Sequence, residues 1–187
     1  SGDHLDLHSF HTRRSSDLGA NNITVDGFYI ENGYNAGRGG GVNIEDSSGV
    51  VIRNNVVRNN QAVGDWGGGL AVINSNVLID GNTITGNQTD GNGGGLSFWN
   101  NCTGSVSGNT ISGNRGYFGG GMIIDGSQLT VSGNAIEQNT ASRSGGGIST
   151  DAAAGTVITA NTFAGNLAYN DGGGINDTND ADRKSVV

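Results

Sequence analysis

The chain has 187 residues, enough for one domain with a buried core, and 36 of them are glycine while none is proline. Its net charge of −8 argues against nucleic acid or an anionic membrane surface as a partner. The single cysteine excludes an internal disulfide framework. No apolar run reaches the ~20 residues of a membrane-spanning helix, so we expect no insertion of this segment into a membrane.

Both ends of the chain resemble translated sequencing-adapter DNA. Residues 2–18 read GDHLDLHSFHTRRSSDL, and a common adapter translates to GDHRDLHSFPTRRSSDL, so only Leu5 and His11 differ. The final DRKSVV, residues 182–187, matches the translated reverse complement of the same adapter. We therefore expect residues 1–18 to be a disordered adapter-derived scar and residues 182–187 to be a second adapter-derived scar. Residues 19–181 are then expected to be an uncapped fragment of a longer protein. The scars hold every histidine and the only lysine, Lys184.

From residue 19 onward the sequence is a repeat. A glycine triplet followed by an apolar residue recurs every 26 to 28 residues, and its copies begin at Gly39, Gly67, Gly93, Gly119, Gly145 and Gly172. Between triplets runs the pattern [VI]-x-x-N-x-[VIF]-x-x-N, as in LIDGNTITGN at 78–87. Periodic glycine of this kind is typical of a repeat fold and not of a disordered chain.

Alternating apolar residues predict three short strands in each repeat. The inward positions form three columns, namely the pairs Val42/Ile44, Leu70/Val72, Leu96/Phe98 and Met122/Ile124, then Ile52, Ile79, Val106, Val131 and Ile158, then Val57, Ile84, Ile111, Ile136 and Phe163. One repeat cannot bury its own apolar face, whereas stacked copies can. The sequence therefore predicts an all-β, right-handed, single-stranded parallel β-helix of about six coils.

Asparagine forms two further columns, both at predicted turns after a strand. The first contains Asn55, Asn82, Asn109, Asn134 and Asn161, and the second contains Asn60, Asn87, Asn114, Asn139 and Asn166. We interpret them as a structural ladder, because an asparagine amide can bond turn backbone and its own stacked copies, and because asparagine tolerates the left-handed conformation. A polar binding strip is the alternative interpretation.

These motifs resemble a known repeat. GGG[ILVM] followed by [IVF]-x-x-N resembles the GGA[ILV] and FxxN repeats of chlamydial polymorphic outer-membrane proteins, and more widely the right-handed β-helix proteins with a pectin-lyase-like fold. Only TFAGN at 162–166 gives the strict FxxN. The resemblance implies an extracellular or outer-membrane-surface segment of a bacterium, adhesive or structural and without catalysis.

The segment between the second asparagine and the next glycine triplet varies in length and sequence, so we expect it to form a loop edge where binding residues collect. It carries aromatic, arginine and aspartate side chains, a combination that suits a carbohydrate or another host or cell-surface ligand. The candidate ligand-binding residues are Tyr34, Arg38, Asp65, Trp66, Asp90, Arg115, Tyr117, Phe118, Arg143, Tyr169 and Asp171. The alternative interpretation is that these aromatic rings shield glycine-rich backbone.

An enzymatic function is the second hypothesis. Parallel β-helices include polysaccharide lyases and glycoside hydrolases, and Asp65 and Asp90 are the nearest pair of acids in one column. Residues 19–181 contain no lysine or histidine that could act as a base. We therefore assign no catalytic residue, metal or cofactor.

Overall fold

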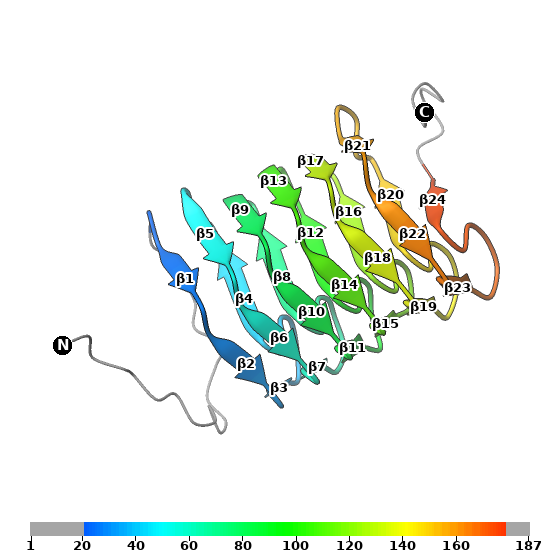
Figure 1. Cartoon of the computed structure of the whole chain (residues 1–187), viewed down its shortest axis with the longest axis horizontal. Coiled ribbons are helices and arrows are strands. Elements are labelled where there is room, and N and C mark those ends of the chain that lie inside the picture. Colours follow the sequence, from blue (N-terminus) through cyan, green and yellow to red (C-terminus); the bar gives the residue numbers. More distant parts are fainter. Residues whose placement is uncertain (1–20, 179–187) are drawn as a thin grey trace.

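The structure is a computed structural model that describes residues 21–178; the predicted adapter-derived ends lie outside the described residues. The described chain is a rod of short parallel strands and contains no helix (Figure 1). Twenty-four strands form four sheets of six, and within each sheet the strands follow one another in coil order. Each coil contributes one strand to every sheet, which confirms the predicted parallel β-helix of about six coils.

We name the sheets A to D in the order in which a coil visits them. Sheet A contains β1 (Thr24–Asp26), β5 (Val50–Arg53), β9 (Asn76–Asp80), β13 (Thr103–Ser107), β17 (Gln128–Ser132) and β21 (Val157–Thr159). Sheet B contains β2 (Tyr29–Glu31), β6 (Val56–Arg58), β10 (Thr83–Thr85), β14 (Thr110–Ser112), β18 (Ala135–Glu137) and β22 (Thr162–Ala164). Sheet C contains β3 (Tyr34–Asn35), β7 (Gln61–Ala62), β11 (Gln88–Thr89), β15 (Arg115–Gly116), β19 (Thr140–Ala141) and β23 (Leu167–Ala168). Sheet D contains β4 (Val42–Glu45), β8 (Leu70–Ile73), β12 (Leu96–Trp99), β16 (Met122–Asp125), β20 (Ile148–Asp151) and β24 (Ile175–Asp177).

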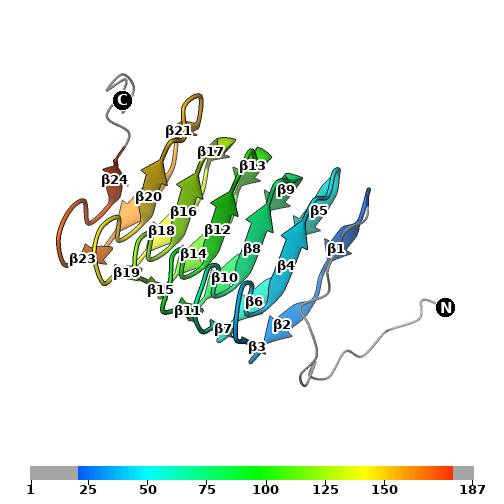
Figure 2. The same ribbon diagram turned by 180° about the vertical axis from the view of Figure 1, so that it is seen from behind.

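Sheets A and B lie on one side of the rod and sheet D on the other. Figure 1 shows β1, β5 and β9 of sheet A in line with β2, β6 and β10 of sheet B. Figure 2, from behind, shows β4, β8, β12 and β16 of sheet D. The short strands of sheet C run along the edge where the chain turns back toward sheet D, so the predicted loop edge follows sheet C.

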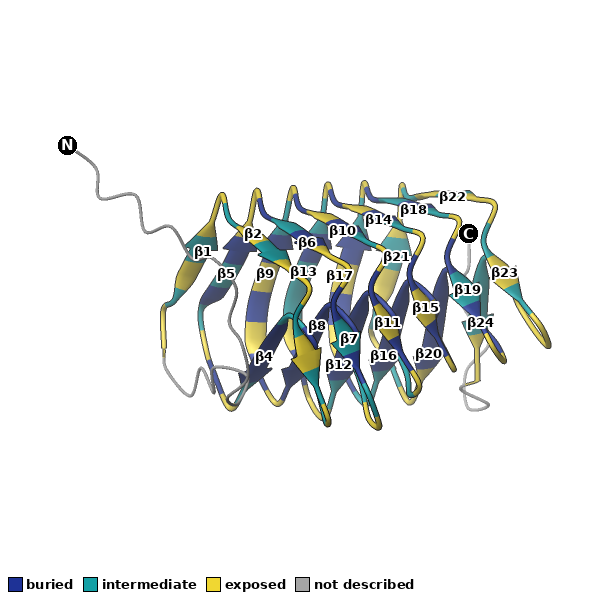
Figure 3. Ribbon diagram, turned by 90° about the horizontal axis from the view of Figure 1, so that it is seen from below, coloured by how far each residue is buried: buried dark blue, intermediate teal, exposed yellow. Residues whose placement is uncertain are grey.

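The core is built from in-register copies of the same apolar position. Leu70, Leu96, Met122 and Ile148 pair along sheet D, and each is fully buried. The second and third predicted columns behave likewise, apart from their last members Ile158 and Phe163, which are half-buried. Figure 3 shows β4, β12, β16 and β20 of sheet D mainly in dark blue for burial. Stacking therefore supplies the apolar environment that one repeat lacks.

The prediction of three strands per coil was wrong, because each coil has four. Sheet C was missed because its strands have only two residues. The inward residue of these strands is small or polar and gives no apolar column: Asn35, Ala62, Thr89, Gly116, Ala141 and Ala168. Tyr34 and Arg115 consequently lie on strands and not in loops.

The glycine triplets are required by close contact between coils. The first glycine of each triplet has positive φ, as at Gly93 with φ 74°. A Cβ on the third glycine, for example Gly95, would lie 2.7 Å from the carbonyl oxygen of Gly121 in the next coil. A Cβ on the second, Gly94, would overlap the carbonyl of Gly120. A side chain at either of these positions in an inner coil would therefore push two coils apart.

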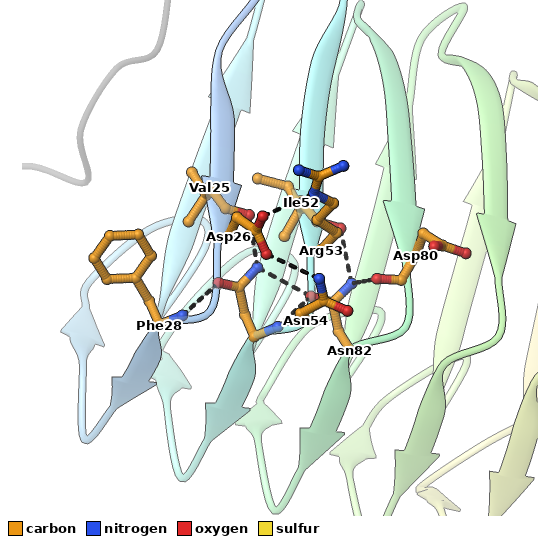
Figure 4. A network of polar contacts seen from close by, with 9 residues as sticks. Val25, Asp26, Phe28, Ile52, Arg53, Asn54, Asp80 and Asn82 are labelled. Carbon is orange, nitrogen blue, oxygen red and sulfur yellow. Dashed lines mark hydrogen bonds and ion pairs between the residues drawn. The ribbon is translucent and has the colours of Figure 1, made fainter. Parts of the chain in front are cut away.

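The asparagines form two hydrogen-bonded ladders, one at the turn between sheets A and B and one between sheets B and C. Asn82 is typical, because its Oδ1 accepts from the backbone nitrogen of Asn55 at 2.9 Å and its Nδ2 donates to the carbonyl of Ile52 at 2.8 Å. Figure 4 shows this start of the first ladder beside Phe28. The left-handed conformation falls on the residue before the ladder asparagine, such as Asn54 with φ 54°, and not on the asparagine itself.

Candidate functional site

The loop edge closes over the outer face of sheet D. The outward residues Asn43, Ala71, Ser97, Ile123 and Ser149 are buried although they point away from the core. Four buried side-chain polar atoms have no hydrogen-bond partner among the described residues: Asn43 Oδ1, Ser97 Oγ, Trp99 Nε1 and Asn176 Nδ2. All four lie at outward positions of sheet D. Such atoms are rare in native proteins, and because each of the four is buried, none of them is open to a ligand at the surface.

One end of the loop edge is a closed stack of three side chains. The rings of Trp66 and Trp99 lie 3.9 Å apart with 16° between their planes, and the Arg38 guanidinium lies 4.6 Å from the Trp66 ring centre. Arg38 also pairs with Asp65, at 3.6 Å from Nε to Oδ2, and with Glu45 at 3.7 Å. A guanidinium and an indole cannot share one ring face, so both faces of Trp66 are covered. Trp66 therefore has no open ring face for a ligand.

The middle of the loop edge carries an open aromatic cluster. Tyr117 is 41% exposed, and its hydroxyl accepts a hydrogen bond from Arg143 Nη1 at 3.1 Å. Phe118 meets the Tyr117 ring edge to face, with centres 5.0 Å apart, and the Arg143 guanidinium lies 5.6 Å from the Phe118 ring centre. The loop that carries Tyr117 and Phe118 and the loop that carries Arg143 belong to neighbouring coils. They are joined by a hydrogen bond from the backbone nitrogen of Arg143 to the carbonyl of Tyr117 at 2.9 Å. An exposed ring with a fixed guanidinium beside it can bind a ligand that has an apolar face and hydroxyl groups.

The remaining candidates are spread along the rod. Tyr34 and Tyr169 are 61% and 69% exposed and belong to the first and last coils. Arg115, Asp90 and Asp171 are exposed, and Asp171 Oδ2 accepts from Ser144 Oγ at 3.4 Å. The structure therefore brings together Arg38, Asp65 and Trp66 as one group, and Tyr117, Phe118 and Arg143 as another.

The structure also brings together two acids that the sequence analysis did not select. Asp125 and Asp151 end β16 and β20 at paired positions of sheet D. They continue an outward column that begins with Glu45 and runs through Ile73 and Trp99. The sequence signal is an acid four residues after the last glycine of a triplet, as in GGGMIID and GGGISTD. The signal is weak because only three of the six glycine triplets are followed by an acid at this position.

A model of the family described as "Right handed beta helix region" matches residues 18–186. The chain belongs to this right-handed β-helix family. No curated protein and no solved structure matches the chain.

The described part of this right-handed β-helix holds no group of three or more His, Cys, Asp or Glu side chains placed to share a metal ion. None of its described segments is a helix that could cross a membrane. A hollow of about 330 Å³ lies at the turns between sheets D and A and is lined by residues 101–103, 126–128, Ala152 and Ala154. It contains none of the candidate residues. Cys102 is buried there, with its Sγ 3.1 Å from the carbonyl of Trp99.

The pair Asp125 and Asp151 predicts a pH dependence of stability. Burial raises the pKa of Asp125 above its ordinary value, and the negative charge of Asp151 raises it further. The protonated form of Asp125 is thus favoured in the folded state. The stability that this preference contributes is complete below the pKa of the unfolded state, and it is lost as the pH rises through the pKa of the folded state. We expect Asp125→Asn to raise the midpoint of thermal unfolding at pH 7 and to have little effect at about pH 3.

Thermal unfolding followed by circular dichroism at the two pH values measures this difference. The exposed loop carboxylate Asp90, changed to asparagine, is the control and should leave both midpoints unchanged. A lower midpoint for Asp125→Asn at pH 7 would contradict the prediction.

Proposed function

We propose that this right-handed β-helix is a non-catalytic recognition segment, secreted or exposed on a bacterial surface, that binds carbohydrate through the cluster of Tyr117, Phe118 and Arg143. The observation that carries the proposal is the exposed Tyr117 ring, whose hydroxyl is held by Arg143. The rod is the scaffold, and its variable loops present the ligand-binding side chains.

The chemistry of this cluster supports a sugar as the ligand. An aromatic ring covers the apolar face of a sugar, while a guanidinium donates hydrogen bonds to hydroxyl or carboxylate oxygens. Arg143 is held by Tyr117 and Phe118, so less side-chain entropy is lost when a ligand binds.

Binding to a panel of polysaccharides tests the proposal. The panel contains polymers of glucose, xylose, mannose, N-acetylglucosamine and galacturonic acid, and affinity is measured by electrophoresis through gels that contain each polymer. We expect Tyr117→Ala to weaken binding at least tenfold, about 1.4 kcal/mol. The matched control is Tyr29→Ala, because Tyr29 is 66% exposed and lies 5.7 Å from an arginine, Arg58, but on sheet B.

The proposal fails if the unmodified chain binds none of the polymers, or if Tyr29→Ala weakens binding as much as Tyr117→Ala. Circular dichroism of both variants shows whether the rod is intact, so that loss of binding is not confused with loss of fold.

One observation favours a fragment of a carbohydrate-active enzyme as a second candidate function. Asp125 and Asp151 stand on neighbouring coils, and the pKa of Asp125 is raised beside the charged partner. Glycoside hydrolysis uses a pair of carboxyl groups, of which the one that acts as the acid has a raised pKa. The predicted pair Asp65 and Asp90 is less suited, because Asp65 is paired with Arg38.

An assay of new reducing ends on the same polysaccharides tests this second function. An enzyme should lose more than a hundredfold of its rate in Asp125→Asn and Asp151→Asn, whereas Asp65→Asn should keep it. Absence of product from every polymer with the folded, unmodified chain would remove this candidate.

A further inference from the structure

The hollow at the turns between sheets D and A results from unequal turn lengths. In the coil of β16 and β17 only Gly126 and Ser127 connect the two sheets, whereas the preceding coil uses residues 100–102 and the following coil uses residues 152–156. Figure 2 shows the longest of these turns as the loop before β21. Two longer turns thus flank a short one, and the hollow of about 330 Å³ is lined by residues of all three.

Hydrogen bonds between coils fix the walls of this hollow. Thr156 Oγ1 donates to the carbonyl of Ser127 at 3.1 Å, so the long turn is attached to the short one. The backbone nitrogen of Cys102 donates to Ser127 Oγ at 3.1 Å, and that of Asn101 donates to the carbonyl of Gly126 at 2.7 Å. The hollow is therefore formed before a ligand arrives, and little conformational entropy is lost on binding.

Two side-chain amides line the hollow and are free to bind a ligand. The amides of Asn101 and Gln128 make no hydrogen bond within residues 21–178. A Cβ added to Gly155 would lie 3.3 Å from Gln128 Nε2, so the Gln128 amide packs against the long turn. Ala152 and Ala154 of the same turn add methyl groups to the lining. The hollow thus combines amide donors and acceptors with small apolar groups.

The charge and the size of the hollow limit what it can bind. None of its lining residues is charged, although the chain has a net charge of −8. The carboxylates nearest in sequence, Asp125 and Asp151, each precede a lining residue but are not part of the lining. A volume of about 330 Å³ is at the lower end of the range of about 300–1,000 Å³ for small-molecule sites. A neutral ligand of the size of one sugar residue fits these limits.

We propose that this hollow is a second binding site, for a neutral N-acetylated amino sugar. An acetamido group has an N–H donor, a carbonyl acceptor and a methyl group. The side-chain oxygen of one amide can accept from the N–H while the nitrogen of the other donates to the carbonyl, and the methyl group can contact Ala152 or Ala154. The site belongs to the turns between sheets D and A, so it does not depend on the cluster of Tyr117, Phe118 and Arg143.

A titration with N-acetylglucosamine, followed by the NMR signals of residues 126–128, tests the proposal. We expect these signals to shift with a dissociation constant on the order of 1 mM, as for a small ligand that makes few contacts. Asn101→Gly should weaken binding about fivefold, because it removes one hydrogen-bonding amide and keeps the positive φ of 58°. Asn100→Gly is the matched control and should bind like the unmodified chain, because Asn100 is also exposed, with φ 54°, but does not line the hollow.

Comparison ligands identify what the hollow recognises. Glucose lacks the acetamido group and glucosamine carries an ammonium group instead, so each should bind about fivefold more weakly than N-acetylglucosamine. Equal binding of glucose overturns the proposal, as does equal binding of glucosamine, which would assign recognition to Asp125 and Asp151. Equal binding of N-acetylglycine methylamide also overturns it, because the ligand would then be a peptide.

The proposal fails as well if N-acetylglucosamine does not shift the signals of residues 126–128, or if Asn100→Gly weakens binding as much as Asn101→Gly. Tyr117→Ala should leave these shifts unchanged, so a failure of the loop-edge cluster to bind polysaccharide is distinguished from a failure of the hollow.

Discussion

Asn114→Ala is expected to lower the free energy of unfolding by about 3–6 kcal/mol, because it leaves several buried polar groups without partners. Asn114 Oδ1 accepts from the backbone nitrogen of Asn87 at 2.9 Å and from its Nδ2 at 3.0 Å. Asn114 Nδ2 donates to the carbonyl of Ile84 at 2.9 Å. No water replaces these bonds, because Asn87 and Asn114 are 0% and 1% exposed. A loss of this size is a large part of a typical domain's stability.

Urea unfolding followed by circular dichroism measures this effect. Asn166→Ala is the control from the same ladder, since Asn166 lies half-buried in the last coil and solvent can replace its bonds. We expect it to cost less than half as much. Equal effects of the two substitutions would show that burial of the ladder does not determine its contribution.

Gly121→Ala is expected to destabilise the rod by about 2–4 kcal/mol, because the added methyl group has no room. Its Cβ would lie 2.7 Å from the carbonyl oxygen of Gly147 and 3.0 Å from Asn139 Nδ2. Both neighbours are fixed, one as backbone and the other as a member of a ladder. The two coils would have to separate, which weakens sheet D and the ladder together.

Gly174→Ala is the matched control, because it changes the same third glycine of a triplet in the last coil. No atom lies within 4 Å of a Cβ there, so we expect little change in the urea midpoint. If Gly121→Ala were as harmless as Gly174→Ala, close approach between coils would not be the reason for the triplets.

Much of the candidate site could not be predicted from the sequence. Trp66 and Trp99 stack although they lie in different repeats and at different repeat positions, so no column relates them. Asp125 and Asp151 share one repeat position and therefore pair in sheet D, but only three glycine triplets are followed by an acid there, so the sequence signal is weak. The loop edge itself was predicted from its variable length and aromatic content. Which of its rings are open, as Tyr117 is, depends on what the neighbouring coil places against each of them.

The sequence by itself determined the rod. A glycine triplet and two asparagines that recur with one apolar pattern every 26 to 28 residues can bury their apolar side chains only by stacking, and this fixes parallel strands, register and approximate coil number. Sheet C was not predicted, because a two-residue strand with a small inward residue gives no periodic signal in the sequence. Only the tertiary structure decided that Arg38 and Trp99 close over Trp66, and that the Tyr117 ring stays exposed beside Arg143. The physical reason is that both features depend on which atoms the adjacent coil supplies, and a repeat pattern does not specify a neighbour that differs from the repeat.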